Sequence, residues 1–199
     1  MTKTQTSLLE SIIAPGALNS IAGLSGMLGE QITATSVTFD RVPIDEISER
    51  AGGPERTFTG VYLAYWGSAT GHMTLLLDPA VTSRLLELLI GRAHAPGTPF
   101  DEIERSALGE LGNIVGSSFL NSISDATGLL LRPSPPDVIV DMIGAVVDIV
   151  AADDLSDDMQ VYLAEVRFAS EALKVEGTFL VVPSSELVAA ISQALVAAR

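Results

Sequence analysis

An acidic side chain and an amide side chain lie three residues apart in a glycine-rich stretch of this sequence. Within residues 101–137, Glu110 is followed by Asn113, and glycines flank both. If this stretch is a helix, the two side chains share one face, because each helical residue advances about 100°. An acid and an amide at this spacing suit the positioning of a small polar reactant.

The same helix would separate polar from apolar residues. On a helical projection five polar residues fall in one narrow stripe: Ser106, Glu110, Asn113, Ser117 and Asn121. A different side carries the apolar residues Leu108, Leu111, Val115 and Phe119. A solvated helix face is the commonest explanation of such a pattern. A typical solvated face carries Lys, Arg and Glu, however, whereas this one carries mostly Ser and Asn.

Three glycines lie beside the polar stripe, at Gly109, Gly112 and Gly116. Each costs a helix roughly 1 kcal/mol relative to alanine. A helix that tolerates them needs something to approach its backbone closely. Packing between helices is one explanation. The other, the approach of a partner's backbone, is expected only when this pattern is combined with the family resemblance that the next residues carry.

The spacing of four residues resembles the active-site signature of a known family. Three residues separate Ser106 from Glu110, and two separate Glu110 from Asn113. Twenty-two residues then lie between Asn113 and Pro136. These residue types and intervals match the signature of the CheC/CheX/FliY family of response-regulator phosphatases, whose first position is Asp or Ser. Residues 110–124 also resemble that family's helix, and the length of the chain resembles CheC most.

The resemblance implies an activity and a role for each residue. Proteins of this family hydrolyse the aspartyl phosphate of the chemotaxis response regulator CheY, in two-component signalling. Because an acyl phosphate is already activated, the reaction needs mainly an in-line water and charge stabilisation. Asn113 would orient the attacking water, and Glu110 would pair with a lysine of the partner. Ser106 and Pro136 would support the site.

No metal site is expected in this chain. The sequence has no Cys, which excludes disulfides, thiolate catalysis and Cys-ligated zinc. Its two histidines, His72 and His94, are too few for a His-rich metal site. By the resemblance, Mg²⁺ would be supplied by the phosphorylated response regulator.

A binding module is the alternative class of function. CheC-type proteins resemble partners of CheD, the receptor glutamine deamidase, so the chain could be a CheD-binding adaptor with little or no phosphatase activity. The acidic turn at residues 153–158, or the last helix, would then offer a surface, although most acidic turns are only solvated. A flagellar-switch component like FliY would carry an additional C-terminal domain. A dimer like CheX is a further alternative.

Charge and hydropathy exclude several partners. The net charge of −14 argues against nucleic acid and against an anionic membrane surface. Residues 1–10 are too polar for a signal peptide, and the most apolar run, 138–152, is interrupted by Asp141 and Asp148. We therefore expect a cytoplasmic protein. The acidic, Lys-poor composition is also compatible with a high-salt cytoplasm.

An internal repeat sets the expected fold. Residues 61–64 recur as 161–164, and each copy is followed by an apolar run, a proline and a helical segment. We predict a single CheC-like domain, 1–199, built from two repeats (about 1–91 and 100–199) with a linker at 92–99. The fold class is α+β, with pseudo-twofold symmetry, a mostly antiparallel sheet and two long helices exposed on one face.

Local signals place the elements. We expect helices over 7–28, 80–90, 100–127 and 184–198, and strands over 31–39, 56–66, 71–77, 159–169 and 173–182. Residues 43–50 form a short helix or turn, and 129–131 and 138–140 are extended. Residues 142–151 fit either a strand or a helix. Pro15 would bend the first helix or reset its start.

The repeat predicts one active site, in the second half. With an offset of 99 residues, Glu110 maps onto Ser11 and Asn113 onto Ala14. Glu10 and Asn19 lie nearby, but they are nine residues apart and cannot form the same pair. The first helix would therefore serve as a scaffold or a partner surface.

Overall fold

The computed structural model describes residues 3–153 and 159–197. The helices are α1 (Lys3–Leu28), α2 (Glu46–Arg50), α3 (Pro79–Ile90), α4 (Glu102–Thr127), α5 (Ile143–Asp153) and α6 (Ser185–Ala197). The strands are β1 (Thr33–Pro43), β2 (Thr57–Gly67), β3 (Gly71–Leu77), β4 (Leu131–Pro133), β5 (Asp137–Met142), β6 (Gln160–Ser170) and β7 (Val175–Pro183). The predicted acidic turn, 153–158, lies almost wholly outside the described residues.

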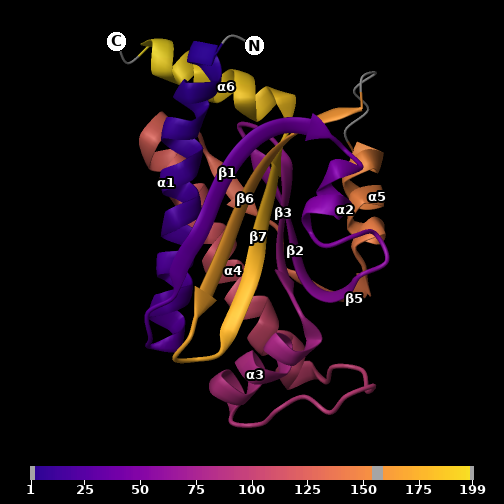
Figure 1. Cartoon of the computed structure of the whole chain (residues 1–199). Helices are drawn as coiled ribbons and strands as arrows, with labels where there is room; N and C mark the ends of the chain where they lie inside the picture. Colours follow the sequence, from indigo (N-terminus) through magenta and orange to yellow (C-terminus); the bar gives the residue numbers. More distant parts are fainter. Residues whose placement is uncertain (1–2, 154–158, 198–199) are drawn as a thin grey trace.

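Within the described residues, seven strands form one antiparallel sheet (Figure 1). The strand order is β1-β6-β7-β3-β2-β4, and β5 also pairs with β2. The α+β class with an antiparallel sheet is therefore confirmed. The two halves of the chain are interlaced, because β1 pairs with β6 and β5 pairs with β2. The duplication and its pseudo-twofold symmetry stay a prediction.

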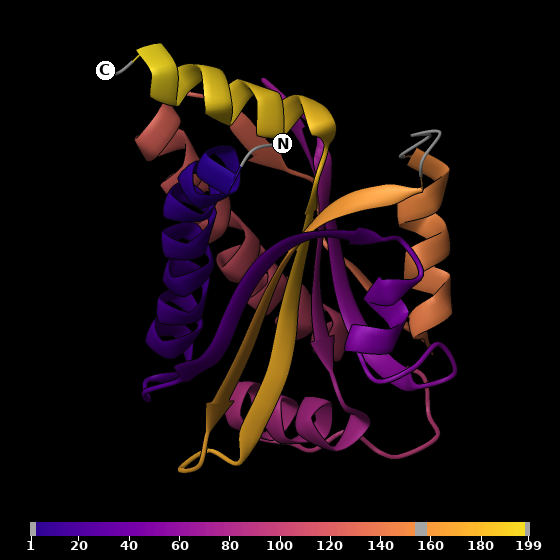
Figure 2. The same ribbon diagram turned by 45° about the horizontal axis from the view of Figure 1, so that its top comes forward.

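Helices cover both faces of the sheet. The long helices α1 and α4 lie together against one face, while α2 and α5 cover the other; α6 and α3 lie at opposite ends (Figures 1 and 2). Alternation along the strands supplies both interfaces. On β7, for example, Phe179 and Val181 face the core under α1 and α4, whereas Leu180 and Val182 face the core under α2 and α5.

Two elements differ from the sequence-based expectation, and a third resolves an ambiguity that the sequence left open. α1 begins at Lys3 and continues through Pro15 without a new start. A proline inside a helix costs about 3 kcal/mol, and here the apolar side of α1 is buried, which offsets that cost. β1 continues to Pro43, four residues further than expected, because it pairs with β6 over its whole length. The ambiguous segment after β5 is the helix α5, which packs Ile143 into the core under α2 and α5.

The expectation that residues 138–152 form the most apolar run was wrong, because the longest apolar segment lies in α1. Residues Leu9–Leu28 are long and apolar enough to cross a membrane, by length and composition alone, and they are the one such segment among the described residues. In this fold the segment lies against the sheet and α4. Its buried side chains recur every three or four residues: Leu9, Ile13, Ala17, Ile21 and Leu24.

Gly112 and Gly116 of α4 face the sheet, so the expectation that they admit a partner's backbone was wrong, whereas Gly109 faces Pro136. A Cβ atom on Gly112 would lie 2.3 Å from Cγ1 of Val61 in β2, and one on Gly116 would lie 3.1 Å from Met73 in β3. Both glycines are buried. They let α4 pack directly onto the sheet. The polar stripe on the opposite side is left facing outward.

This close approach predicts the effect of adding one methyl group. Gly112→Ala should lower the free energy of unfolding by about 1–3 kcal/mol, because Val61 is branched at Cβ and cannot move away from the new atom. Urea denaturation at neutral pH would measure it. The matched control is Gly26→Ala in α1, where a Cβ meets nothing within 4 Å and should stabilise the helix by up to about 1 kcal/mol. Equal stability of the two variants would contradict the packing argument.

Candidate active site

A capping box fixes the start of α4. Asp101 is the N-cap: its Oδ1 accepts a hydrogen bond from the backbone N–H of Glu104 at 2.9 Å, and Glu104 Oε2 accepts from the backbone N–H of Asp101 at 3.0 Å. At the other end Gly128 adopts a left-handed conformation with φ 74°, as expected of a helix C-cap. The motif helix therefore begins and ends within two residues of its predicted bounds.

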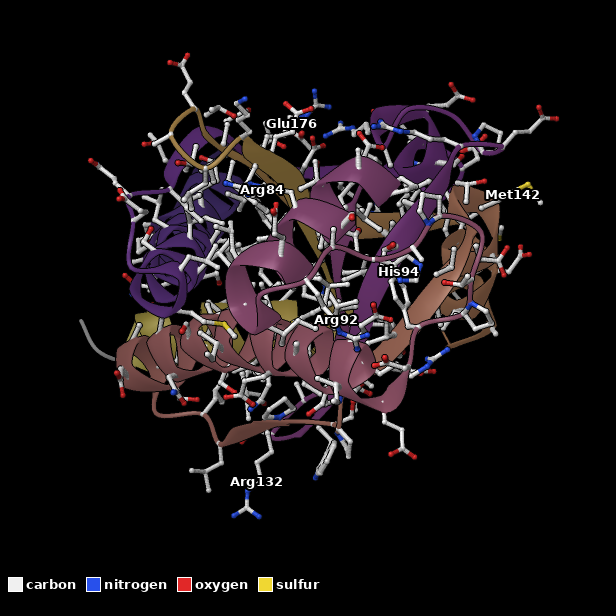
Figure 3. All side chains as sticks on the ribbon, turned by 90° about the horizontal axis from the view of Figure 1, so that it is seen from below. Arg84, Arg92, His94, Arg132, Met142 and Glu176 are labelled. Carbon is white, nitrogen blue, oxygen red and sulfur yellow. The ribbon has the colours of Figure 1, made fainter. Side chains whose placement is uncertain are left out.

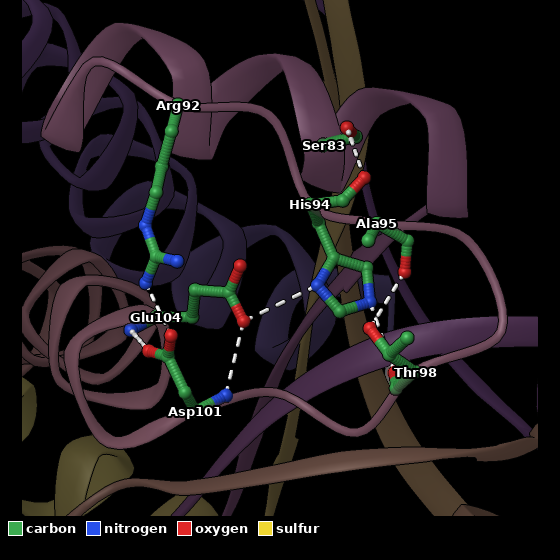
Figure 4. Close-up of polar contacts among 7 residues, drawn as sticks. All are labelled: Ser83, Arg92, His94, Ala95, Thr98, Asp101 and Glu104. Atoms are coloured by element: carbon green, nitrogen blue, oxygen red, sulfur yellow. Dashed lines mark hydrogen bonds and ion pairs between the residues drawn. The ribbon is translucent and has the colours of Figure 1, made fainter.

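The linker before α4 is tied to the same carboxylate (Figure 4). Nδ1 of His94 lies 3.2 Å from Glu104 Oε2, and its Nε2 lies 3.1 Å from the carbonyl oxygen of Thr98. Both ring nitrogens thus lie within hydrogen-bonding distance of an oxygen atom. Arg92 adds an ion pair with Asp101. The first turn of α4 is consequently anchored to the chain that leaves α3.

A groove of about 740 Å³ runs along the N-terminal half of α4, and all four signature residues line it. It lies between the helix and the extended segment that follows β4. The lining residues are Glu102, Arg105, Ser106, Gly109, Glu110, Asn113, Pro133, Ser134, Pro135 and Pro136. The structure therefore brings Pro136 next to Ser106, Glu110 and Asn113 although it is distant in sequence.

Two contacts join the chain after β4 to α4, and a third joins it to β2. A Cβ atom on Gly109 would lie 3.2 Å from Cγ of Pro136, so this glycine lets the proline ring approach the helix. Arg105 donates from Nη1 to the carbonyl oxygen of Val138 at 2.8 Å. Ser134 binds β2, because the backbone N–H of Ala64 donates to its Oγ at 3.1 Å. These contacts position the extended segment beside the helix.

The acid and the amide are available to a ligand. Ser106 and Glu110 are exposed, and Asn113 is half-buried. In the described part of the chain, the side chains of Ser106 and Glu110 form no hydrogen bond or ion pair. The Oδ1 atom of Asn113 accepts from Ser117 Oγ at 3.4 Å. That contact leaves the amide nitrogen free to donate a hydrogen bond into the groove.

Arg105 belongs to the groove but was not singled out from the sequence. The available signal was its position, since it immediately precedes Ser106 in a chain with only eleven Lys and Arg residues. Metal ligands do not gather here. Across residues 3–153 and 159–197, no group of three or more His, Asp or Glu side chains could hold a metal ion.

The corresponding region of α1 is built differently. Ala14 lines a separate groove with Glu10 and residues 37–40 of β1. Asn19 donates from Nδ2 to Ser122 Oγ of α4 at 3.1 Å, so its amide serves the contact between the two helices. A single site in the second half stays our prediction.

Comparisons with known proteins bear on this region and on the whole chain. A family model described as the CheC-like family matches residues 103–140, which hold α4, β4 and the groove. Over 145 residues the chain is 30% identical to the CheY-P phosphatase CheC of Bacillus subtilis (strain 168). That alignment covers 72% of this chain and 69% of the relative.

Solved structures support the fold. FliY from Thermotoga maritima superimposes with a TM-score of 0.69 at 22% identity, covering 100% of this chain and 99% of that one. The middle domain of FliM from H. pylori gives a TM-score of 0.66 at 14% identity, covering 98% and 99%. The fold and the groove on its long helix define a CheC-like α+β protein. With the identity to Bacillus CheC, the chain belongs to the CheC/CheX/FliY family.

The capping carboxylate gives the site a testable pH dependence. The backbone N–H of Glu104, and then Arg92, hold the pKa of Asp101 below its ordinary value. A lowered pKa in the folded state stabilises the protein above the unfolded pKa, and this stabilisation is lost as pH falls through the folded pKa.

Asp101→Asn keeps an acceptor at the N-cap but removes the charge. The variant should unfold more readily than the wild type at pH 7. The difference should begin to shrink below about pH 4, near the unfolded pKa of an aspartate, and should vanish only below the lower folded pKa of Asp101. Thermal unfolding followed by circular dichroism between pH 3 and pH 7 would measure it. A difference that persists unchanged at pH 3 would contradict this account.

Proposed function

We propose that this protein accelerates hydrolysis of the aspartyl phosphate of a CheY-type response regulator, which is the activity named for its Bacillus relative. One observation carries the proposal. Glu110 and Asn113 lie one turn apart in an open groove beside Pro136, with the carboxylate free of partners in the described chain. Side chains that only stabilised the fold would be engaged with it.

Asn113 would act on water. Its amide can accept from and donate to a water molecule, so it can orient an in-line attack on phosphorus without acting as a base. Ser117 would hold the amide by its hydrogen bond to Oδ1. Half-burial of Asn113 restricts its rotamers, which favours a fixed direction of attack.

Glu110 would set the register of the complex. A carboxylate beside the phosphoryl group would repel it, so direct contact with phosphate is disfavoured. Pairing with a lysine of the partner's phosphorylation site would use the charge and fix the orientation of the two proteins. The Mg²⁺ ion would come with the phosphorylated partner. Ser106 would extend the polar face toward the start of α4, and Pro136 would form the opposite wall.

The CheD-binding adaptor is the alternative. It would use a surface other than the groove and would not require Glu110 or Asn113. The same cytoplasmic location is expected for both functions.

Substitution of the pair tests the proposed reaction. The wild-type protein should accelerate decay of the phosphorylated response regulator, and Glu110→Ala or Asn113→Ala should each reduce this acceleration about a hundredfold. Release of inorganic phosphate from a 32P-labelled cognate regulator would measure it.

The matched control is Asn121→Ala, an exposed asparagine two turns further along the same stripe and outside the groove. This variant should keep the wild-type rate. No acceleration by folded wild-type protein with a cognate regulator would refute the phosphatase and leave the adaptor role. If Asn121→Ala reduced the acceleration as much as the other two variants, the assignment of the site to residues 110 and 113 would be refuted.

A further inference from the structure

The arginines of this acidic chain are mostly neutralised within the fold. Five form ion pairs with carboxylates of the same chain: Arg50, Arg56, Arg84, Arg92 and Arg167. Arg41 lies over the ring of Tyr162, 6.0 Å from its centroid. Among the described residues Arg105 and Arg132 have no carboxylate partner.

Arg105 lines the candidate groove, and Arg132 lies in β4, next in sequence to a residue that lines it. The bond from Nη1 of Arg105 to Val138 holds the side chain in place while other guanidinium N–H groups stay free. Arg132 immediately precedes Pro133, which also lines the groove. Figure 3 shows Arg132 extending outward from the molecule on the side of α4. The two arginines without a carboxylate partner thus lie in segments that form or adjoin one site, whereas Lys174 lies elsewhere, in the turn between β6 and β7.

Exposed apolar side chains accompany the two arginines. Trp66 lies directly opposite Arg132 in the pairing of β2 with β4 and is 47% exposed. Leu130, two residues before Arg132, is 73% exposed, and Ile103, in the first turn of α4, is 61% exposed. Tryptophan and arginine are the residues most enriched in binding hot spots. This composition is typical of a docking surface rather than of a solvated rim.

Electrostatics indicates what such a surface accepts. The chain carries a net charge of −14, so any protein with a phosphorylated, acidic face is repelled at long range. Glu102 and Glu110 also line the groove, and the unpaired arginines offset part of that repulsion there. A pocket on the other face of the sheet also gathers Arg50, Arg56 and Arg167, but their ion pairs with carboxylates of this chain compensate them.

We propose that Arg105 and Arg132 dock the acidic surface around the phosphoryl group of the partner and so determine which phosphorylated protein enters the groove. The inference rests on the proposed function, since it uses the same groove. The arginines act on encounter and affinity and leave the hydrolysis step to Asn113 and Glu110. Their contribution is electrostatic and is screened by salt.

Charge removal tests this inference. Arg105→Gln keeps a side-chain donor for the Val138 carbonyl but loses the charge, whereas Arg105→Lys keeps the charge. The double variant Arg105→Gln/Arg132→Gln should raise the half-saturating concentration of phosphorylated regulator roughly fivefold, with an unchanged rate at saturation. Arg105→Lys should resemble the wild type. Added salt should raise the half-saturating concentration more for the wild type than for the double variant.

Arg84→Gln is the matched control, because Arg84 also donates to a backbone carbonyl, that of Leu173, and lies on α3 outside the groove. This variant should leave the half-saturating concentration and the rate at saturation unchanged. An unchanged half-saturating concentration in the double variant overturns the inference. A lower saturating rate with unchanged half-saturation also overturns it, since that outcome places the arginines in the chemical step.

A binding measurement separates this inference from the proposed function. Titration of this protein with a beryllofluoride-treated response regulator, followed by fluorescence of Trp66, reports docking without turnover. Arginine-dependent binding by a wild type that does not accelerate hydrolysis would refute the phosphatase and uphold the docking surface. Hydrolysis that requires Asn113 but is unchanged by removal of both arginines would support the phosphatase and refute the docking surface. Absence of any binding by the wild type overturns both.

Discussion

The close packing of α4 onto the sheet is the constraint on which the site depends. Gly112 and Gly116 remove the side chains that would hold the helix away from Val61 and Met73, and Gly109 does the same for Pro136. The helix is therefore fixed between β2 and β3 on one side and the extended segment on another. Its only free side carries the polar stripe. Glu110 and Asn113 owe their exposure to glycines that face the opposite way.

Charge is arranged around this helix in a consistent order. At its start, Asp101 and Glu104 cap the backbone and hold Arg92 and His94. Beyond this cap the pairing stops. Arg105, directly after Glu104, has no carboxylate partner in the described chain, and the side chain of Glu110, further along the helix, has no partner there. Buried or interfacial charges are stable when paired, and unpaired ones persist where solvent or a ligand meets them. The change from paired to unpaired charge marks where the fold ends and the recognition surface begins.

The sequence predicted most of the elements but not all of their contacts. A local signal gave the end of α4, since Gly128 favours a helix C-cap, and the start of the helix was predicted within two residues. The type of α5 was not predictable, because a short apolar segment fits two periodicities, and its packing against α2 decides between them. The direction of the α4 glycines was missed for a similar reason. A helical projection shows which residues share a side, but only the position of Val61 and Met73 shows which side faces the sheet.

The exchange of strands between the halves has a consequence for how the chain acquires its structure. β1 completes its ladder only with β6, and β2 receives β5 only after α4 has been made. Until the second half has been synthesised, the first half therefore has an unpaired sheet edge, and the apolar side of α1 is exposed. Pairing between segments so remote in sequence is slow, and the waiting species is the one most prone to aggregate. The yield of this protein would then depend mainly on how well newly made chains are protected, by a chaperone or by rapid completion of the second half. The stability of the finished fold would matter less.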